Sequence, residues 1–454
     1  MIVLLVLLGL FVGCSHDSGV SSEGELLSSS VDEYVVSSAV ETPNSSALQI
    51  VSSSSQAVIS SASQPIASSS SQVSLSSDSS SPLSSESKPR QDFSFYTGAD
   101  ISTVQEYERF GAKFFDVDGS EADIFSILKK HGFNAIRLRT FVSPAAQFGY
   151  AAKGCDHDAE AYGDKEHVIA YAQKVKAAGM AFLLDIHYSD NWADPGKQII
   201  PSRWRGVQNS DYLADSIYVY TYDLVSALKQ VNATPDMVQI GNETTPGILI
   251  HVPNSSTNCW GDGVEKAPAS VSGDMGTSVG KANAAKYFKA GIRGVKAVSQ
   301  DIKTILHIER IRNSETVNWW MKEIFINQKV PADVMGFSAY TAYGDGSPDS
   351  WLSLFQSLSE SYPDLEFIVA EYNGGDAKNH YSFDGSRKRT NQVVRGLDRW
   401  IGSFFWEPTM SGDWGAALFD WEGSNLKANR DAFEEFTPEE PSSPFPVPER
   451  SRQP

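Results

Sequence analysis

The 454-residue chain is poor in cysteine and in basic residues, and each shortage excludes a class of site or partner. It has 3 cysteines, and its 8 histidines do not cluster, so no spacing typical of a zinc site is present and we predict neither a metal site nor a cofactor. Asp and Glu (56) outnumber Lys and Arg (37), which gives a formal net charge of −19. Because this charge repels a phosphate backbone, nucleic acid is not expected as a partner.

The chain also lacks a Gly-x-Gly-x-x-Gly or Walker loop after its first predicted strand, which removes the main support for a nucleotide-binding fold. A long hydrophobic run is missing as well: residues 1–13 are almost wholly apolar but too few to cross a membrane as a helix. They are typical of a signal peptide, although no Lys or Arg precedes them. Val12-Gly13-Cys14 resembles the end of a bacterial lipoprotein signal. We therefore predict a signal peptide over residues 1–14 and export as a cell-surface or outer-membrane lipoprotein anchored through Cys14, with simple secretion as the alternative.

Serine dominates the next segment, and such a composition buries too little apolar surface to fold. We predict a disordered linker over residues 15–92 and a disordered tail over residues 437–454. Between them, residues 93–436 are rich in Trp, Tyr and Phe and predict one folded domain. We expect a monomer that contacts the membrane through the lipid anchor alone.

Within residues 93–436, short apolar runs alternate with segments of helical periodicity. The predicted strands span residues 95–101, 135–141, 181–187, 237–243, 303–309, 333–340, 366–371 and 402–407. The predicted helices span residues 121–131, 165–178, 211–231, 281–299, 315–327, 351–359 and 388–400. Eight strands with helices between them predict a (β/α)8 barrel, with a doubly wound open sheet as the alternative.

Two of these predicted strands deliver a carboxyl group at their C-terminal end. The fourth runs into Gly241-Asn242-Glu243, and the seventh ends in Glu371. The C-terminal ends of barrel strands meet at one mouth, so we expect the two carboxyls on opposite walls of that mouth. Glycoside hydrolysis needs such a pair, one protonated to donate to the leaving oxygen and one ionised to attack the anomeric carbon.

With these motifs in place, residues 93–436 resemble the endo-β-1,4-galactanases of glycoside hydrolase family 53, which are retaining (β/α)8 enzymes. The most specific block is residues 184–198, which read Leu-Asp-Ile-His-Tyr-Ser-Asp-Asn-Trp-Ala-Asp-Pro-Gly-Lys-Gln. Further blocks are residues 134–139, residues 241–243, His307, residues 404–408 and residues 417–420. The resemblance implies hydrolysis of β-1,4-galactosidic linkages in the galactan and arabinogalactan side chains of plant cell-wall pectin, with retention of configuration.

The same resemblance implies roles for three residues. Glu243 would be the general acid/base, Asn242 would contact the 2-hydroxyl of the sugar in the −1 subsite, and Glu371 would be the nucleophile. Two positions depart from the family pattern: Tyr372 stands where Thr usually follows the nucleophile, and Ser338-Ala339-Tyr340-Thr341 replaces Ser-Tyr-Tyr-Pro. These departures affect the sugar subsites and leave both carboxyls in place.

Other residues at strand ends are candidates for binding substrate or supporting the carboxyls. Arg137 is expected to hold Glu371 ionised by a charge-assisted hydrogen bond, with Arg139 on the same side as the alternative. His187 would bond the substrate or orient a carboxylate, or it is a core histidine with a backbone partner. Asp185 fits a supporting position at a strand end better than a third catalytic acid.

Aromatic side chains are further candidates for contacting the substrate or the nucleophile, and two cysteines are candidates for a disulfide. Tyr340 would donate to the nucleophile, and Trp406 would offer a platform for a galactose ring. Further platform candidates, most of which we expect to be packed, are Trp192, Trp260, Trp319, Trp320 and Trp351. Cys155 and Cys259 are expected to form a disulfide between two loops, the alternative being two free thiols.

Two other functions share part of this pattern. An endo-β-mannanase or endo-glucanase of the same clan would carry the same two glutamates, and residues 184–198 argue against it. A non-catalytic polysaccharide-binding lipoprotein is the alternative from another class, and the presence of both Glu243 and Glu371 argues against it. We expect the long loop over residues 244–280 to influence product length and specificity.

Overall fold

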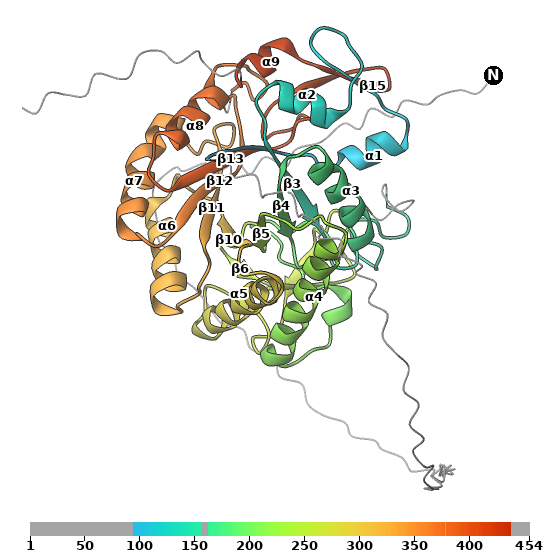
Figure 1. The fold of residues 1–454 in the computed structure, drawn as a ribbon. Coiled ribbons are helices and arrows are strands. Elements are labelled where there is room, and N and C mark those ends of the chain that lie inside the picture. The colour runs from blue at the N-terminus through green and yellow to red at the C-terminus, as the bar shows by residue number, and fades with distance from the viewer. Residues whose placement is uncertain (1–93, 156–161, 377, 437–454) are drawn as a thin grey trace, which may run out of the picture. The chain divides into compact units, whose positions relative to one another are not determined.

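A computed structural model describes residues 94–155, 162–376 and 378–436. The predicted signal peptide, Cys14, the linker and the tail lie outside the described residues. Eight parallel strands close into a barrel, with helices outside it, in the order β1-β13-β12-β11-β10-β5-β4-β3 (Figure 1). The strands are β1 (Tyr96–Asp100), β3 (Ala135–Thr140), β4 (Ala181–Ile186), β5 (Met237–Ile240), β10 (Lys303–Ile308), β11 (Val334–Tyr340), β12 (Glu366–Asn373) and β13 (Trp400–Phe405). The predicted (β/α)8 barrel is confirmed.

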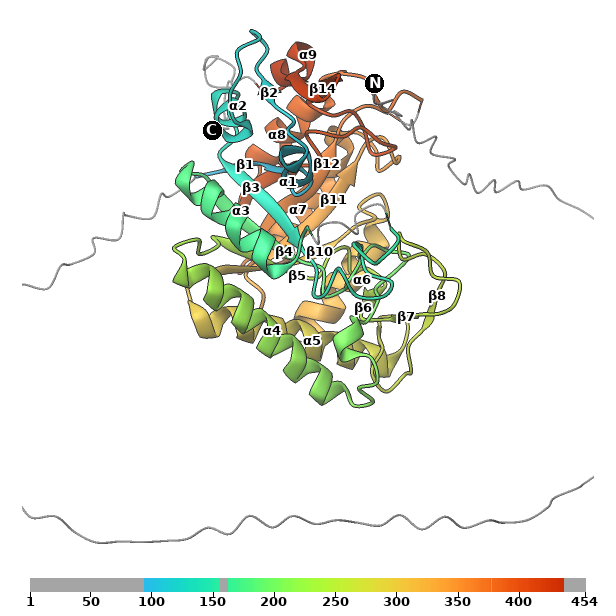
Figure 2. The ribbon, with the colours of Figure 1, turned by 90° about the vertical axis from the view of Figure 1, so that its right-hand side faces the viewer.

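The main helices lie where apolar periodicity predicted them. They are α2 (Ile124–Lys130), α3 (Lys165–Ala177), α4 (Ser210–Gln230), α5 (Ser278–Val298), α6 (Ser314–Met321), α7 (Leu352–Ser361) and α8 (Ser386–Arg395). Figure 2 shows α4 and α5 side by side against the outside of the barrel. Among the described residues, no helix is both long and apolar enough to span a membrane.

Several predicted boundaries differ from the structure: among them, the strand over residues 237–243 ends at Ile240, and the helix over residues 388–400 ends early. The predicted helix over residues 388–400 ends at Arg395, and Trp400 opens β13 instead. Gly396 caps the helix and Arg399 has a left-handed φ of 63°, so the chain turns before it reaches Trp400. The Trp400 ring is buried and stacks on Phe355 and Phe367. Helical periodicity continued across this turn because a buried aromatic residue suits either element.

Small elements missed by the periodicity analysis decorate the barrel. In the loop after β5, β6 (Gly247–Ile248) pairs with β9 (Gly273–Asp274), and β7 (His251–Pro253) pairs with β8 (Val264–Lys266). Elsewhere, β14 (Phe419–Glu422), β15 (Asn425–Ala428) and β2 (Phe114–Phe115) form a three-stranded sheet. The shorter helical segments are α1 (Val104–Arg109), η1 (Ser202–Trp204), η2 (Lys322–Asn327), η3 (Pro348–Trp351) and α9 (Arg430–Glu434). These segments are too short for an apolar period to emerge.

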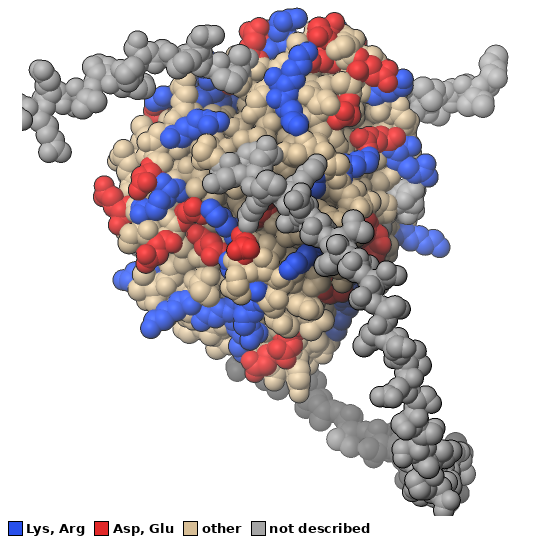
Figure 3. All heavy atoms as spheres, in the orientation of Figure 1, with Lys and Arg blue, Asp and Glu red and all other residues tan. Residues whose placement is uncertain are grey.

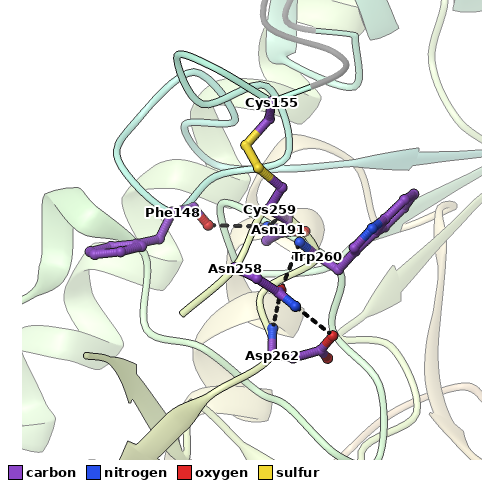
Figure 4. The surroundings of a disulfide bond; sticks show 7 residues. All are labelled: Phe148, Cys155, Asn191, Asn258, Cys259, Trp260 and Asp262. Carbon is purple, nitrogen blue, oxygen red and sulfur yellow. Dashed lines mark hydrogen bonds between the residues drawn. A yellow bond between two sulfur atoms is a disulfide. The ribbon is translucent and has the colours of Figure 1, made fainter. Parts of the chain in front are cut away.

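The predicted disulfide is present. Cys155 and Cys259 are joined with a Cα–Cα distance of 5.6 Å, across 104 residues of sequence (Figure 4). The bond ties the loop after β3 to the loop after β5. Asn191 reinforces it, because its Nδ2 donates to the carbonyl oxygens of Phe148 and Cys259 at 3.1 and 2.9 Å.

The inside of the barrel has two layers that follow from strand alternation. The lower layer is apolar and consists of Tyr96, Ala135, Ala181, Leu183, Met237, Ile305, Val334, Ile368, Ala370 and Phe404. Two residues further along their strands, side chains on the same face are polar. This upper layer includes Arg137, Asp185, Gln239 and His307, all with 0% exposure. The apolar layer thus supports a buried polar layer under the barrel mouth.

Candidate active site

Glu371 reaches the mouth through an irregularity in β12. Ile368 and Ala370 belong to the inner apolar layer, so strict alternation would turn residue 371 outward. The pairing with β11 shifts there: Phe337 pairs with Val369, but Ser338 pairs with Glu371. Ala370 is therefore the extra residue of a β-bulge, a feature that re-aims side chains next to functional sites. The bulge places the Glu371 carboxyl beside Arg137.

Arg137 joins the residues of the upper layer. Its Nη1 donates to Asp100 at 3.0 Å, and its Nη2 lies 2.9 Å from Asp185 and 2.8 Å from Glu371. Nη2 also donates to the Asn242 side-chain oxygen at 3.0 Å. A fully buried guanidinium with this many acceptors is fixed in one position, and so are the groups that it contacts.

Arg139 has different neighbours, although it lies on the same face of β3. Its guanidinium stacks on Trp192, with a distance of 4.2 Å to the ring centroid, and lies 5.7 Å from the ring centroid of Tyr150. The alternative left open by the sequence is therefore resolved in geometry: the contact with Glu371 is made by Arg137.

Two contacts of Glu371 favour its ionised form, although its pKa remains above the usual value. The Tyr340 hydroxyl donates to Oε2 at 2.8 Å, opposite the Arg137 contact on Oε1. Burial raises the pKa of the Glu371 carboxyl, and the charge of Arg137 and the Tyr340 hydrogen bond oppose that rise. Both carboxylate oxygens thus have a donor.

The side chain of Glu243 has fewer hydrogen-bond donors around it than that of Glu371. The strand stops at Ile240, because Gly241 (φ 87°) and Glu243 (φ 46°) are in left-handed conformations that turn the chain into the mouth. Within the described part of the chain, the Ser338 hydroxyl is the single group that donates to its side chain, at 2.7 Å from Oε1. Burial and the charges of Glu371 and Glu309 raise the pKa of Glu243 well above its usual value. The pKa of Glu243 is thus raised more strongly than that of Glu371, which favours Glu243 as the protonated member of the pair.

Asn242 is oriented by partners on both ends of its amide. Its side-chain oxygen accepts from Arg137 at 3.0 Å and from Gln239 at 3.1 Å, while its nitrogen donates to the Ala193 carbonyl at 2.8 Å. A second N–H of that nitrogen remains for another acceptor. Gln198 supports the backbone here by donating to the Asn242 carbonyl at 2.8 Å.

His187 and Asp185 lie beneath the carboxyls. His187 Nε2 is 3.0 Å from Asp185 Oδ2, and its Nδ1 accepts from the Ala193 N–H at 3.0 Å. Asp185 also accepts from Arg137 and Gln239, and it is fully buried. Both ring nitrogens of His187 and both oxygens of Asp185 thus have protein partners, which places the two residues in support of the site.

The tryptophans predicted as sugar platforms differ in how much of the side chain is exposed. Trp406 is partly exposed, and its ring packs edge-on against Trp192 at 5.9 Å. Trp320 and Trp351 are buried at 0% and 2% exposure, so they are core residues. Trp260 and Trp319 remain exposed at 43% and 40%, with Trp260 directly after the disulfide cysteine Cys259 (Figure 4).

Sequence reasoning missed the roles of His307, Ser338, Gln239 and Glu309. His307 and Ser338 appeared only within blocks of the family resemblance, and the polar residue in the apolar run of β5 was noted without a role. In a strand, residues two positions apart point to the same side. His307 and Gln239 each lie two residues beyond an apolar residue that faces the inside of the barrel, and this spacing is the signal that would have found them. Glu309, with 8% exposure directly after β10, has no comparable signal in the sequence.

The side chains of the site are carboxyls, amides, hydroxyls, imidazoles and a guanidinium. The described residues hold no group of three or more His, Cys, Asp or Glu side chains suited to a metal ion.

On the face shown in Figure 3, Lys and Arg side chains are interspersed with Asp and Glu side chains. A protonated carboxyl and an ionised carboxyl at the same mouth suit acid-assisted displacement at a carbon centre.

Comparisons with known proteins agree with this chemistry. The model of glycosyl hydrolase family 53 matches residues 96–439. An arabinogalactan endo-β-1,4-galactanase of Cellvibrio japonicus is 31% identical over 288 residues, which are 61% of this chain and 65% of that protein. Another, from Thermothelomyces thermophilus, is 28% identical over 335 residues, which are 69% of this chain and 89% of that protein. The solved family 53 catalytic domain of Ignisphaera aggregans has a TM-score of 0.60 at 27% identity, covering 77% of this chain and 98% of that structure.

Proposed function

The chain belongs to glycosyl hydrolase family 53, and on that basis we propose that it is an endo-β-1,4-galactanase acting on the galactan and arabinogalactan side chains of pectin. The observation that carries the proposal is the pairing of Glu243 and Glu371 in unequal environments at the ends of β5 and β12. Because the chain spans 65% of the length of the Cellvibrio relative, the activity of that protein is transferred here as a proposal.

In the first step, Glu371 attacks the anomeric carbon of the sugar in the −1 subsite. The bond to the leaving oxygen breaks, and that oxygen takes the proton of Glu243. Arg137 and Tyr340 keep Glu371 ionised until the covalent bond forms. The products of this step are a shortened polysaccharide and a glycosyl-enzyme.

In the second step, ionised Glu243 removes a proton from water, and the water oxygen attacks the same carbon. The bond to Glu371 breaks and the carboxylate returns to its initial state. Two displacements at one carbon retain the configuration of the sugar. We assign the second N–H of the Asn242 side chain to the 2-hydroxyl and the face of Trp406 to the sugar ring, where carbohydrate C–H groups pack against the indole.

We further propose that the enzyme is exported and that a lipid on Cys14 anchors it, with residues 15–92 as a tether and residues 93–436 as the catalytic domain. Labelled palmitate incorporation that disappears in Cys14→Ser is the expected result. Incorporation that survives the substitution would contradict the anchor and leave simple secretion.

The test of the activity uses linear β-1,4-galactan. Wild-type protein should release galacto-oligosaccharides whose new reducing ends are first seen by NMR as the β anomer, and Glu371→Ala should lose at least a thousandfold in rate. β-Mannan and β-glucan are the comparison substrates. If either is cleaved faster than galactan, the proposed substrate is wrong. Galactan binding without release of reducing ends would instead support a binding protein.

A further inference from the structure

A chain of three buried polar groups leads from the side chain of Glu243 into the barrel. Ser338 Oγ lies 2.7 Å from Glu243 Oε1, and His307 Nε2 lies 2.9 Å from Ser338 Oγ. On the other side of the ring, His307 Nδ1 lies 3.1 Å from Gln239 Nε2. Ser338, His307 and Gln239 are 1% exposed or less. The proposed function assigns a role to Glu243 and none to the groups behind it.

When Glu243 is ionised, its contact with Ser338 determines the hydrogens between the two side chains. A carboxylate oxygen only accepts, so the single proton of Ser338 Oγ must point to Glu243. The lone pairs of Ser338 Oγ then face His307, whose Nε2 must carry a proton to complete the 2.9 Å contact. Burial and the charge of Arg137 lower the pKa of His307 well below its usual value, so the ring is neutral and its Nδ1 accepts.

Donors are in place for that accepting nitrogen. Gln239 Nε2 is identified as nitrogen because it donates to Asp185 Oδ1, an acceptor, at 2.6 Å. Its second hydrogen is shared between His307 Nδ1 and the Asn242 side-chain oxygen, each at 3.1 Å, and the Glu243 backbone N–H lies 3.4 Å from His307 Nδ1. The Asn242 side-chain oxygen, an acceptor, also lies 3.0 Å from Nδ1, so the donation from Ser338 to Glu243, and not the set of Nδ1 contacts, is what selects the proton on Nε2.

We propose that Ser338 and His307 are positioning residues that stabilise the ionised form of Glu243, the form that accepts a proton from water when the glycosyl-enzyme is hydrolysed. The proposal rests on the proposed function and adds two residues to it. In the alternative tautomer, with the proton on Nδ1, Ser338 would donate to His307 and leave the carboxylate without its donor.

The charged groups around these side chains either raise the pKa of Glu243 or act on His307. Glu371 on β12, Glu309 directly after β10 and Asp194 in the loop after β4 all disfavour the ionised form of Glu243. The hydroxyls of Tyr340, which is buried, and Tyr343, which is 50% exposed, interact with the same carboxyl. His307 is faced by the charged groups Arg137 and Asp185 and by His187. The Ser338 hydroxyl is therefore the favourable contact that can be removed by itself.

The first experiment is a pH profile. Ser338→Ala should move the basic limb of kcat/KM on galactan to higher pH by roughly one unit, the loss expected for a hydrogen bond to a charged group. Ser338→Thr keeps the hydroxyl and should keep the limb where wild type has it. Ser272→Ala is the matched control, because the Ser272 hydroxyl is buried and finds no partner among the described residues. An unshifted limb in Ser338→Ala would overturn the proposal.

The second experiment isolates the hydrolysis of the glycosyl-enzyme. A dinitrophenyl β-galactobioside has a leaving group that needs no proton, so the second step limits its turnover. Ser338→Ala should lower kcat on it roughly tenfold near neutral pH, the same fold-change as the lost hydrogen bond. Azide attacks without a general base and should restore the rate, giving a β-glycosyl azide. A lowered kcat that azide does not restore would contradict the proposal.

A third measurement is independent of activity. Above the titration of Glu243, the 15N shifts of His307 should show a proton on Nε2, and a 13C titration of the Glu243 carboxyl should move to higher pH in Ser338→Ala. A proton on Nδ1 would overturn the proposal. If these NMR results are obtained while wild type fails to cleave galactan, the proposed function fails and the positioning role stands.

Discussion

At the scale of single residues, Arg137 links the chemistry to the scaffold. It contacts Glu371 directly, and through Asp100, Asp185 and Asn242 it reaches three other strands or strand ends. A lysine in the same position would keep the positive charge and would supply fewer donors on a thinner, more flexible stem.

We predict that Arg137→Lys lowers kcat/KM on galactan by roughly a hundredfold or more, because Asn242 and Glu371 lose their shared donor. The acid limb of the pH profile, which reports ionisation of Glu371, should move to higher pH as the stabilising contact weakens. Arg139→Lys is the paired control: its effect should fall on stability through Trp192 and leave the acid limb in place. Equal shifts of the limb in both variants would contradict this assignment.

At the scale of elements, the turn after β5 decides where the proton donor lies. Gly241 has a φ of 87°, and a Cβ placed on it would lie 2.9 Å from the Thr244 Cγ2 atom. An L-residue at this position would be destabilised both by the left-handed conformation and by the close contact with Thr244.

We predict that Gly241→Ala destabilises the protein by about 1–2 kcal/mol in urea unfolding and lowers kcat on galactan more than tenfold, because Glu243 is displaced. A substrate with a dinitrophenyl leaving group should suffer a smaller loss in the first step. Gly423→Ala is the matched control, since Gly423 has a positive φ of 67° and open space around it. A similar loss of kcat in that variant would show that backbone strain alone is responsible.

The disulfide acts on a second pair of elements, the loops after β3 and β5. Cross-linking across 104 residues restricts the unfolded chain, so we predict that Cys155→Ser with Cys259→Ser lowers the free energy of unfolding by about 2–4 kcal/mol. The loss should appear equally in wild type treated with a reductant. An unchanged urea midpoint in both samples would contradict the prediction.

At the scale of the whole molecule, a buried carboxyl outside the proposed chemistry affects pH stability. Glu407 is 1% exposed, and its oxygens accept from Thr103 and from the backbone and hydroxyl of Thr409. Burial nevertheless raises the pKa of Glu407 from 4.5 to about 7. Between these two values the folded protein holds more protons than the unfolded chain, so Glu407 makes stability fall as pH rises through this window.

We predict that replacing Glu407 by Gln removes this decline. The difference in unfolding free energy between wild type and Glu407→Gln should change by about 3 kcal/mol from pH 4.5 to pH 7 and stay constant above that range. Urea unfolding at half-unit intervals of pH would measure it. A constant difference across the range would mean that Glu407 titrates near its ordinary pKa in the folded protein.

The amino-acid sequence by itself determined the barrel, the positions of Glu243 and Glu371 near strand ends, and the inward direction of Arg137 and Asp185. These features depend on short-range periodicity, which the order of residues expresses directly. Family resemblance added the roles of the two glutamates, and the disulfide partners followed from their context.

Only the tertiary structure decided which contacts those residues make. The choice of Arg137 over Arg139, the bulge at Ala370 that turns Glu371 inward, and the Ser338–His307 pair behind Glu243 all join residues on different strands. Such contacts depend on the register between strands distant in sequence and on burial of the assembled mouth. The unequal environments of the two carboxyls come from the same source, because neither burial nor the distance between charges exists before the barrel closes.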